Sequence, residues 1–355
     1  MKCYVIMPPG GNIYHCDSDK IVSDAEKFDN NSVLLVVDSI TDSELVEIVQ
    51  IRGRPKYIVS ESYSFLNVPG LKIYSVAKWV EKEIERCIPR MKTIDQIQTT
   101  HSASFCVNKK QTNRHLLLKL SEIFQIKANY TWSGIGKTFD LSSIVEEKNQ
   151  IMDNIIKSCF HKILEPIEMD KNWVGKGSNI TESSIIKYGE NYESWNSGLD
   201  EIIGNSAIHL IAESIISNTD ACHFTEKTVY AMQGLTFPIW IGGKNQASEW
   251  KKYGFDIFED IIDHSYESED TLLERCFYAF YLNLELLQNK DKAAYLRHAN
   301  LQRLQKNQQL LTHQTLKKYN DSIVSLWPED LQQAIVPLFK KYCHVESTLL
   351  NKINN

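Results

Sequence analysis

The stretch HFTEKTVYAMQGLTFPIWIGGKNQASEWKKYGFDIFEDIIDHSY, which runs from His223 to Tyr266, contains the pattern that decides the fold. Within it, the apolar run Phe237–Ile241 predicts a buried strand that ends on Gly242 and Gly243. A strand that ends in glycines before a helix leaves backbone N–H groups at a positive helix end, where phosphate or sugar oxygens bind well. The sequence therefore predicts an α/β domain with a ligand at this edge.

A helix start precedes that strand. Thr225 is a suitable N-cap, and the acid Glu226 and the base Lys227 follow it directly. Such a pair also occurs at ordinary capped helix starts. Next to a glycine-ended strand, however, a carboxylate can accept ligand hydroxyls and an ammonium can screen phosphate charge. We interpret both residues as ligand-binding.

Strands and helices alternate through most of the chain, which favours doubly wound parallel sheets. A long helical pattern over Leu141–Ile163 and a polar stretch over Gly175–Gly198 separate the two α/β parts. In the first part we expect strands at Cys3–Met7, Val33–Val37, Tyr57–Ser60, Lys72–Tyr74 and Ser104–Val107, with helices at Asp42–Ile51 and Val76–Cys87. In the second we expect strands at 207–212 and 237–241 and helices at about 225–234, 246–253 and 269–288, before a polar helical segment broken at Pro328.

The length of 355 residues exceeds what one hydrophobic core serves, so the chain is expected to have two domains. We expect an N-terminal Rossmann-like domain over 1–135, an interdomain helical region over 136–205, a C-terminal ligand-binding domain over 206–300 and a C-terminal helical segment over 301–355. The acidic net charge of −6 argues against a general nucleic-acid binder. None of the eight cysteines forms a C-x-x-C pair, and no apolar run is long enough to span a membrane, so we expect a cytoplasmic protein, in the host cytoplasm if viral.

Three blocks of the chain carry a family resemblance, and the first of them lies within His223–Tyr266. FTEKT at Phe224–Thr228, followed after a helix by PIWIGG, resembles the sugar-nucleotide motif in the C-terminal domain of fucosyltransferase-like glycosyltransferases of the GT-B fold. The continuation to FEDIIDHSYE is similar to an uncharacterised phage and bacterial group. There His264 stands in place of the usual acid and Glu267 in place of Asp.

Two further segments extend this resemblance over roughly Ser104–Tyr266. FCVNKKQTNRH at Phe105–His115 is similar to the strand, basic loop and leucine-rich helix of the same group, and AIHLIAES at Ala207–Ser214 to a strand that ends in an acid. The matching side chains of the first segment are Asn108, Lys109, Lys110, Arg114 and His115.

The resemblance implies two Rossmann-like domains facing a cleft, and transfer of a sugar from a nucleotide-sugar donor to an acceptor hydroxyl without a metal or other cofactor. It implies that Glu226 binds the donor's ribose or sugar hydroxyls and that Lys227 neutralises its diphosphate. The donor-binding set we expect is Asn108, Lys109, Arg114, Thr225, Glu226, Lys227, Gly242 and Gly243.

Other candidate residues are expected to face the cleft. Glu213 and Asp263 are the candidate catalytic acids of the cleft, able to take the acceptor proton. Gly10, Gly11 and Asn12 follow the first strand and are expected on the acceptor side. Arg114 is the preferred phosphate ligand, because its planar fork binds two oxygens at once.

Two motif-like segments carry no site. Asp17-Ser18-Asp19 has D-x-D spacing but follows no predicted strand, so we expect no metal there. Gly134–Thr138 is P-loop-like, yet Thr131 stands where the first glycine belongs.

Two alternative functions stay open: a non-catalytic module of the same fold that binds a nucleotide sugar or glycan, and a phage-type transferase acting on modified DNA bases. The acceptor, whether glycan, small molecule or modified DNA, is left unresolved.

Overall fold

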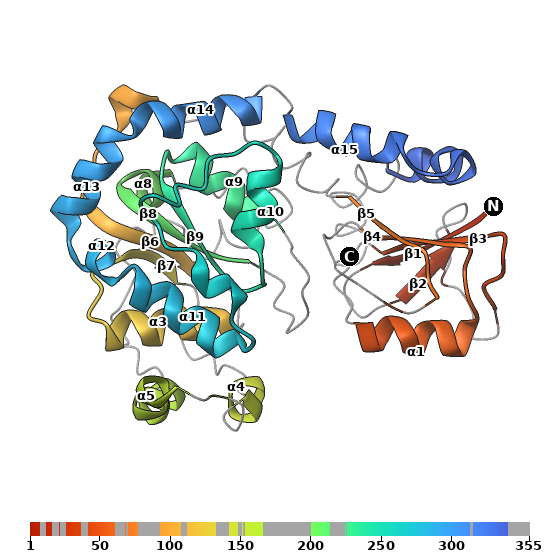
Figure 1. Ribbon diagram of the computed structural model, residues 1–355, viewed down its shortest axis with the longest axis horizontal. Helices are drawn as coiled ribbons and strands as arrows, with labels where there is room; N and C mark the ends of the chain where they lie inside the picture. Colours follow the sequence, from red (N-terminus) through yellow and green to blue (C-terminus); the bar gives the residue numbers. More distant parts are fainter. Residues whose placement is uncertain are drawn as a thin grey trace, which may run out of the picture. The chain divides into compact units, whose positions relative to one another are not determined.

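The computed structural model divides the chain into two compact units, and each is described by itself (Figure 1). Unit 1 comprises Met1–Lys82, Thr219–Phe224 and Gln314–Asn355, and unit 2 comprises Glu83–Asn218 and Thr225–His313. The structure describes residues 1–7, 12–15, 21, 26–36, 42–60, 68, 70–76, 93–107, 112–132, 142–147, 151, 153–165, 200–213, 224, 226–312 and 315–339.

Unit 1 contains a five-stranded sheet in the order β2-β1-β3-β4-β5. All neighbours are parallel except β2, which returns antiparallel beside β1. The strands are β1 (Lys2–Met7), β2 (Asn12–His15), β3 (Ser32–Val36), β4 (Tyr57–Ser60) and β5 (Ile73–Ser75). Because β1, β3 and β4 are apolar on both faces, the sheet must be covered on both sides.

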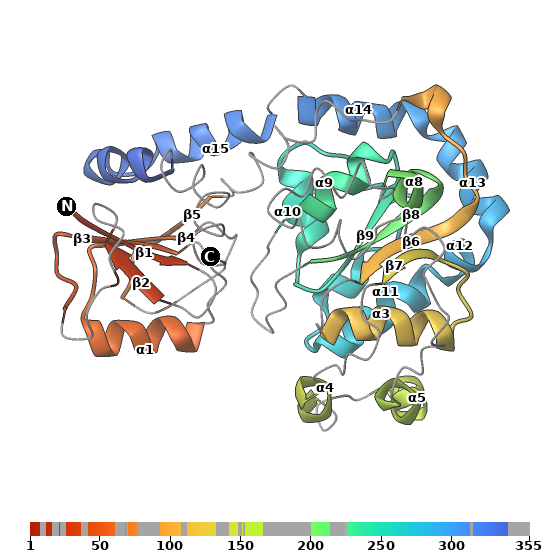
Figure 2. The ribbon, with the colours of Figure 1, turned by 180° about the vertical axis from the view of Figure 1, so that it is seen from behind.

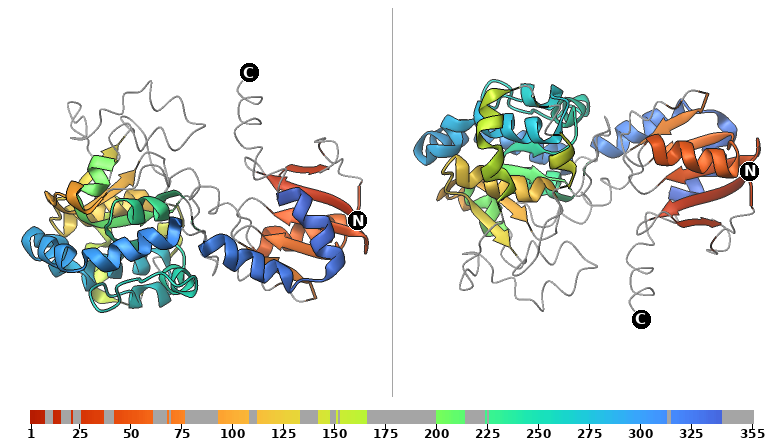
Figure 3. Two further views of the ribbon diagram at one scale, coloured as in Figure 1. Left: turned by 90° about the horizontal axis from the view of Figure 1, so that it is seen from above. Right: turned by 90° about the horizontal axis from the view of Figure 1, so that it is seen from below.

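The helix α1 (Asp42–Arg52) covers one face of this sheet, packing Leu45 and Val49 against Ile6 and Leu34 (Figure 1). The C-terminal part of the chain covers the other face. There α15 (Thr315–Ser325) and a helix over 329–339 lie across the strands, as the view from above shows (Figure 3). The side chains of this second layer include Val324, Trp327, Leu331, Ile335, Leu338 and Phe339.

Polar contacts hold the second layer in place. The carboxylate of Asp330 pairs with the Lys56 ammonium, and the Tyr57 hydroxyl donates to it at 3.1 Å. The break between the two helices falls at 326–328, where Pro328 was expected to interrupt the helical segment. The C-terminal helices are therefore an integral layer of unit 1.

Unit 2 contains a four-stranded, fully parallel sheet in the order β7-β6-β8-β9. The strands are β6 (His101–Val107), β7 (Asn129–Trp132), β8 (Ser206–Ala212) and β9 (Phe237–Ile241). The two helical crossovers that join these strands closely are α3 (Thr112–Ile123), between β6 and β7, and α9 (Glu226–Gln233), between β8 and β9. The mixed α/β class expected from the sequence is confirmed, and the two sheets are compatible with two Rossmann-like domains.

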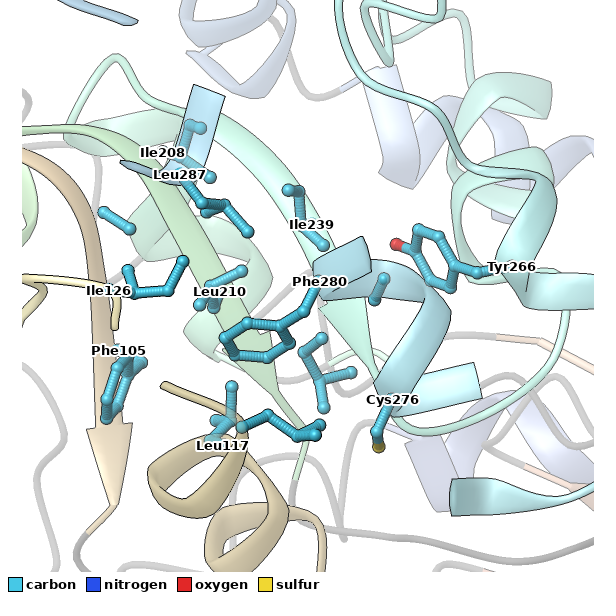
Figure 4. Packing of buried hydrophobic residues seen from close by; sticks show 14 of the residues in the cluster. Phe105, Leu117, Ile126, Ile208, Leu210, Ile239, Tyr266, Cys276, Phe280 and Leu287 are labelled. Carbon is cyan, nitrogen blue, oxygen red and sulfur yellow. The ribbon is translucent and has the colours of Figure 1, made fainter. Parts of the chain in front are cut away.

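Helices cover both faces of this sheet (Figures 1 and 2). One face packs against α3 and against α11 (Leu272–Leu282), which meet over the strands; Figure 4 shows Phe105, Leu210 and Ile239 of the sheet facing Leu117 and Phe280 of those helices. The opposite face packs against α9. The remaining helices of the unit are η2 (Ile94–Gln96), α4 (Ser142–Glu147), α5 (Asn154–Leu164), α8 (Asp200–Gly204), α10 (Gln246–Lys252), η4 (Ser265–Ser268), α12 (Leu284–Gln288), α13 (Lys290–Ala299) and α14 (Leu301–Thr312).

A buried arginine lies at the N-terminal ends of three strands of the four-stranded sheet. Arg297 of α13 donates to the carbonyls of Leu235 (2.9 Å), Gly204 (2.8 Å) and Gly234 (2.7 Å), and to the Thr99 hydroxyl (3.0 Å). Thr99, Gly204 and Gly234–Leu235 precede β6, β8 and β9 respectively. One side chain therefore ties together the segments that enter three strands.

The unit boundaries correct the expected domain division. The sequence analysis assigned β6, α3 and the segment up to residue 135 to the N-terminal domain, whereas they belong to unit 2, because β6 pairs with β8 in one sheet. The region 136–205 was expected to be interdomain. Its described helices α4 and α5 instead pack into the core of unit 2 through Ile144, Ile156 and Phe160.

Several element bounds also differ from expectation. The helical pattern over Leu141–Ile163 forms two helices, and the pattern over 269–288 is broken at Asn283 into α11 and α12. The edge strands β2 and β7 were not expected. The predicted helix over Val76–Cys87 lies outside the described residues, apart from Val76, which follows β5. Among the described residues, no helix is long and apolar enough to cross a membrane.

Candidate functional site

The strand order of unit 2 creates a topological switch point between β6 and β8. From β6 the chain proceeds through α3 to β7 on one side, and β8 and β9 follow on the other side. In open α/β sheets, ligands bind in the crevice outside the carboxyl ends of the strands at such a point. Here those ends are Val107 and Ala212, and Arg114 and Glu213 are predicted site residues in the segments that follow these strands in the chain.

Asn113 joins the elements that meet at this edge. It is fully buried in the first turn of α3, and its Nδ2 donates to the Glu213 carbonyl after β8 and to the Ile241 carbonyl at the end of β9, both at 3.1 Å. Two carbonyl acceptors fix which end of the amide is nitrogen. The start of α3 is thus held against the ends of two strands.

Glu213, a candidate catalytic acid, is fully buried at the end of β8. Its Oε1 accepts a hydrogen bond from Thr228 Oγ1 at 2.7 Å, and that hydroxyl accepts one from Trp240 Nε1 at 3.0 Å. The three side chains form a chain from β8 through α9 to β9. In this structure Glu213 is tied into the fold by Thr228, and its role as a base stays a prediction.

Gly242, a predicted donor-binding residue, lies beside Asn113. A Cβ at Gly242 would stand 3.9 Å from Asn113 Nδ2 and 3.8 Å from Gln246 Oε1. The Gly242 carbonyl accepts a hydrogen bond from Nε of the buried Arg275 at 2.8 Å. Arg275 Nη1 also donates to the carbonyls of Glu269 (2.8 Å) and Asp270 (2.9 Å), so the start of α11 anchors the glycine turn.

The start of α10, which follows the glycine pair, is engaged by a carboxyl of the protein itself. Both oxygens of buried Glu267 lie 2.9 Å from the Ala247 N–H. Burial raises the pKa of Glu267 to about 8, opposed by the N–H groups of Ala247 and Ser248 and by the charge of Arg275. From the sequence, a ligand was expected to bind the N–H groups of this helix start. The structure gives its Ala247 N–H to Glu267.

Lys227 lies buried in the first turn of α9, close enough to His209 for its charge to affect that imidazole. Burial, followed by the nearby charge of Lys227, lowers the pKa of His209 to about 3. The neutral imidazole exchanges a hydrogen bond with Ser104 Oγ at 3.0 Å through Nδ1. His209 is therefore a core residue.

The structure places the remaining predicted residues as follows. Arg114 is buried in the first turn of α3, next to Asn113, and Gly243 is buried after Gly242. Glu226 begins α9. Asn12 begins β2 in unit 1. Asn108, Lys109, Thr225, Gly10 and Gly11 lie outside the described residues, as do Asp17 and Asp19.

Asp263, the second candidate catalytic acid, has local partners. Its exposed carboxylate accepts hydrogen bonds from the Ser265 N–H (2.9 Å) and hydroxyl (2.6 Å), and its own N–H donates to Asn283 Oδ1 at 2.9 Å. Asn283 caps the end of α11, whereas Arg275 contacts Gly242 near the start of that helix. The two contacts are about 12 Å apart along the helix, and the place of Asp263 in the candidate site stays a prediction.

Asn113, Thr228, Arg275 and Glu267 are the members of this edge that sequence reasoning did not single out as site residues. Asn113 stood within the quoted basic segment, and Arg275 is the one cation in a helix, LLERCFYAFYL, whose only other charged residue is Glu274. Within the described ranges, no group of three or more His, Cys, Asp or Glu side chains could hold a metal ion.

No protein-family model matches the chain. The search of curated proteins finds no match either.

Proposed function

We propose that the protein is a glycosyltransferase of GT-B type that moves a sugar from a nucleotide-sugar donor to an acceptor hydroxyl. The observation that carries this proposal is the switch point of unit 2, where the starts of α3 and α9 and the ends of β8 and β9 bring Asn113, Glu213 and Gly242 together. The sequence blocks that resemble the fucosyltransferase-like pattern are the segments that meet there. Asn113 and Glu213 are 100 residues apart in the chain, and their contact supports a ligand site shared by the two segments.

The roles of the side chains follow from their chemistry. Glu226 and Lys227 at the start of α9 would bind sugar or ribose hydroxyls and balance diphosphate charge, and Arg114 would contact a phosphate. Positive groups at this edge would stabilise the leaving diphosphate, whose charge grows in the transition state. Gly10, Gly11 and Asn12 stay the predicted acceptor-side residues.

A second candidate function is a binding module that holds the nucleotide sugar without turning it over. The burial of Glu213 and the local partners of Asp263 favour it, because both carboxylates already accept hydrogen bonds from hydroxyls of the protein. Donor binding is common to both functions. Donor hydrolysis or transfer belongs to the enzyme alone.

The test is a thermal-shift panel of UDP-, GDP-, ADP-, CMP- and dTDP-sugars. A donor at a hundred times its dissociation constant should add about 2.7 kcal/mol of stability. Glu226→Ala and Lys227→Ala should abolish the shift, with their ligand-free unfolding as the check on folding. Lys252→Ala removes a solvent-facing cation from α10 and is the matched control. If no nucleotide sugar stabilises the wild-type protein, the proposed function is wrong.

A further inference from the structure

Three helices of unit 2 begin at the carboxyl edge of its sheet: α3 after β6, α9 after β8 and α10 after β9. Each helix start offers N–H groups and a partial positive charge to an anion. The three starts differ in their acidic residues, and this difference decides which of them suits a phosphate.

Acids already stand at two of the three starts. At α10, Glu267 accepts the Ala247 N–H and Glu249 lies in the first turn. At α9, the first helical residue is itself an acid, Glu226, and its charge offsets that of Lys227, which follows it. By contrast, α3 has no acid in its first turn and carries Arg114 there. Electrostatics therefore favours α3 for an anionic group and the acid of α9 for hydroxyl groups.

A second observation at the start of α3 points to a ligand. With Nδ2 of Asn113 committed to two carbonyls, its buried Oδ1 has no hydrogen-bond partner among the residues that the structure describes. A buried carbonyl oxygen without a donor costs free energy, which a ligand hydroxyl would recover. Asn113 lies beside Gly242, so this acceptor stands at the same strand edge as the predicted donor site.

Resting on the proposed function, we infer that the start of α3 binds the phosphate of the donor and that Asn113 Oδ1 accepts a hydrogen bond from a hydroxyl of the same ligand. Asn113 is thus a specificity residue. It favours a phosphate ester that carries a nearby hydroxyl over a bare phosphate. The Nδ2 contacts hold that acceptor in a fixed position relative to β8 and β9.

Calorimetric titration with inorganic pyrophosphate tests the phosphate half without knowledge of the nucleotide. Arg114→Gln should weaken pyrophosphate binding about tenfold or more, the size of a lost charge-assisted hydrogen bond. The matched control is Lys119→Gln, which removes a similarly buried cation five residues further along α3 and should change binding less than about threefold. If Arg114→Gln does not fold, Arg114→Lys keeps the charge and should still weaken binding through the lost planar fork.

The hydrogen bond to Asn113 Oδ1 is tested by comparing two affinities: that for pyrophosphate and that for the nucleotide sugar that shifts the melting temperature most. Asn113→Leu should lower the ratio of nucleotide-sugar to pyrophosphate affinity about fivefold, while Lys119→Gln leaves the ratio unchanged. An unchanged ratio in Asn113→Leu would overturn the role of Oδ1. The phosphate half fails if wild-type protein does not bind pyrophosphate, or if Lys227→Ala abolishes that binding while both Arg114 variants retain it. Pyrophosphate binding that depends on Arg114, without binding of any nucleotide sugar, would support a phosphate site at the start of α3. It would refute the proposal that the ligand of this site is a nucleotide sugar.

Discussion

At the scale of the residue, Glu267 shows how one side chain can replace a ligand at a helix start. Its carboxyl engages the Ala247 N–H, and Arg275, anchored on the Gly242 carbonyl, lies close enough to favour its charged form. Burial outweighs these favourable contacts and raises the pKa of Glu267 to about 8. The start of α10 is consequently fixed by a group that changes charge near neutral pH.

We predict that Glu267 makes the folded protein less stable as the pH rises from about 5 to 8. Between its unfolded pKa near 4.5 and its folded pKa of about 8, the folded chain binds the extra proton. The free energy of unfolding should therefore fall by at most about 1.4 kcal/mol per pH unit across this window. Urea unfolding at pH 5.5, 6.5 and 7.5 measures it. Glu267→Gln should flatten the profile, and parallel profiles for the two proteins would contradict the prediction.

The residues that close the candidate site could be predicted only in part. Glu213 and Gly242 follow from local signals, an acid and a glycine at the ends of apolar strands. Asn113 and Arg275 do not, because their partners lie far away in the chain: Asn113 reaches Ile241, and Arg275 reaches Gly242. A single sequence carries no direct sign of such pairings. Only the strand order brings them together.

At the scale of the element, the strands that are buried on both faces were the most predictable. Tyr57–Ser60 and Phe237–Ile241 form β4 and β9 with the bounds expected from their apolar runs. The edge strands β2 and β7 are four residues each and mix polar with apolar side chains, so they carry weak periodicity. Asn283 breaks the predicted 269–288 helix, where its amide contacts the Asp263 and Ala279 carbonyls.

Arg297 yields a prediction about how these elements are held together. The guanidinium is fully buried, and burial lowers its pKa to about 10, so it stays charged at neutral pH. Arg297→Leu leaves the Gly204, Gly234 and Leu235 carbonyls without their donor. We expect a loss of about 3 kcal/mol or more in the free energy of unfolding, because each unsatisfied buried acceptor costs about 1 kcal/mol or more.

The matched control for Arg297 is Arg303→Leu in α14. Arg303 is about one-third exposed, pairs with Asp256 and Asp260 on the surface, and lies over the Phe258 ring at 4.9 Å. Solvent screens surface pairs, so its loss should cost about 1 kcal/mol. Urea unfolding of both variants compares them. If Arg303→Leu proved the more damaging, the ion pairs, and not the carbonyl contacts of Arg297, would dominate.

At the scale of the whole molecule, the chain builds unit 1 from both of its ends. The sheet formed by the first 80 residues is covered on one face by α1 and on the other by residues 315–339. Nothing in the first strands indicates which later segment covers them, since their apolar pattern requires only that some layer does. For this reason the sequence did not predict to which domain the C-terminal helical segment belongs.

The last prediction tests that layer. Leu331→Asp puts a charge into the fully buried contact between the 329–339 helix and the sheet, which should cost several kcal/mol. Val336→Asp lies on the same helix at 39% exposure and should cost far less. Hydrogen exchange, read peptide by peptide, should accelerate in β3 and β4 of the Leu331 variant and stay unchanged in β8 and β9. Equal acceleration in both sheets would show that the two units unfold together, and no change in β3 and β4 would show that the C-terminal helices do not stabilise unit 1.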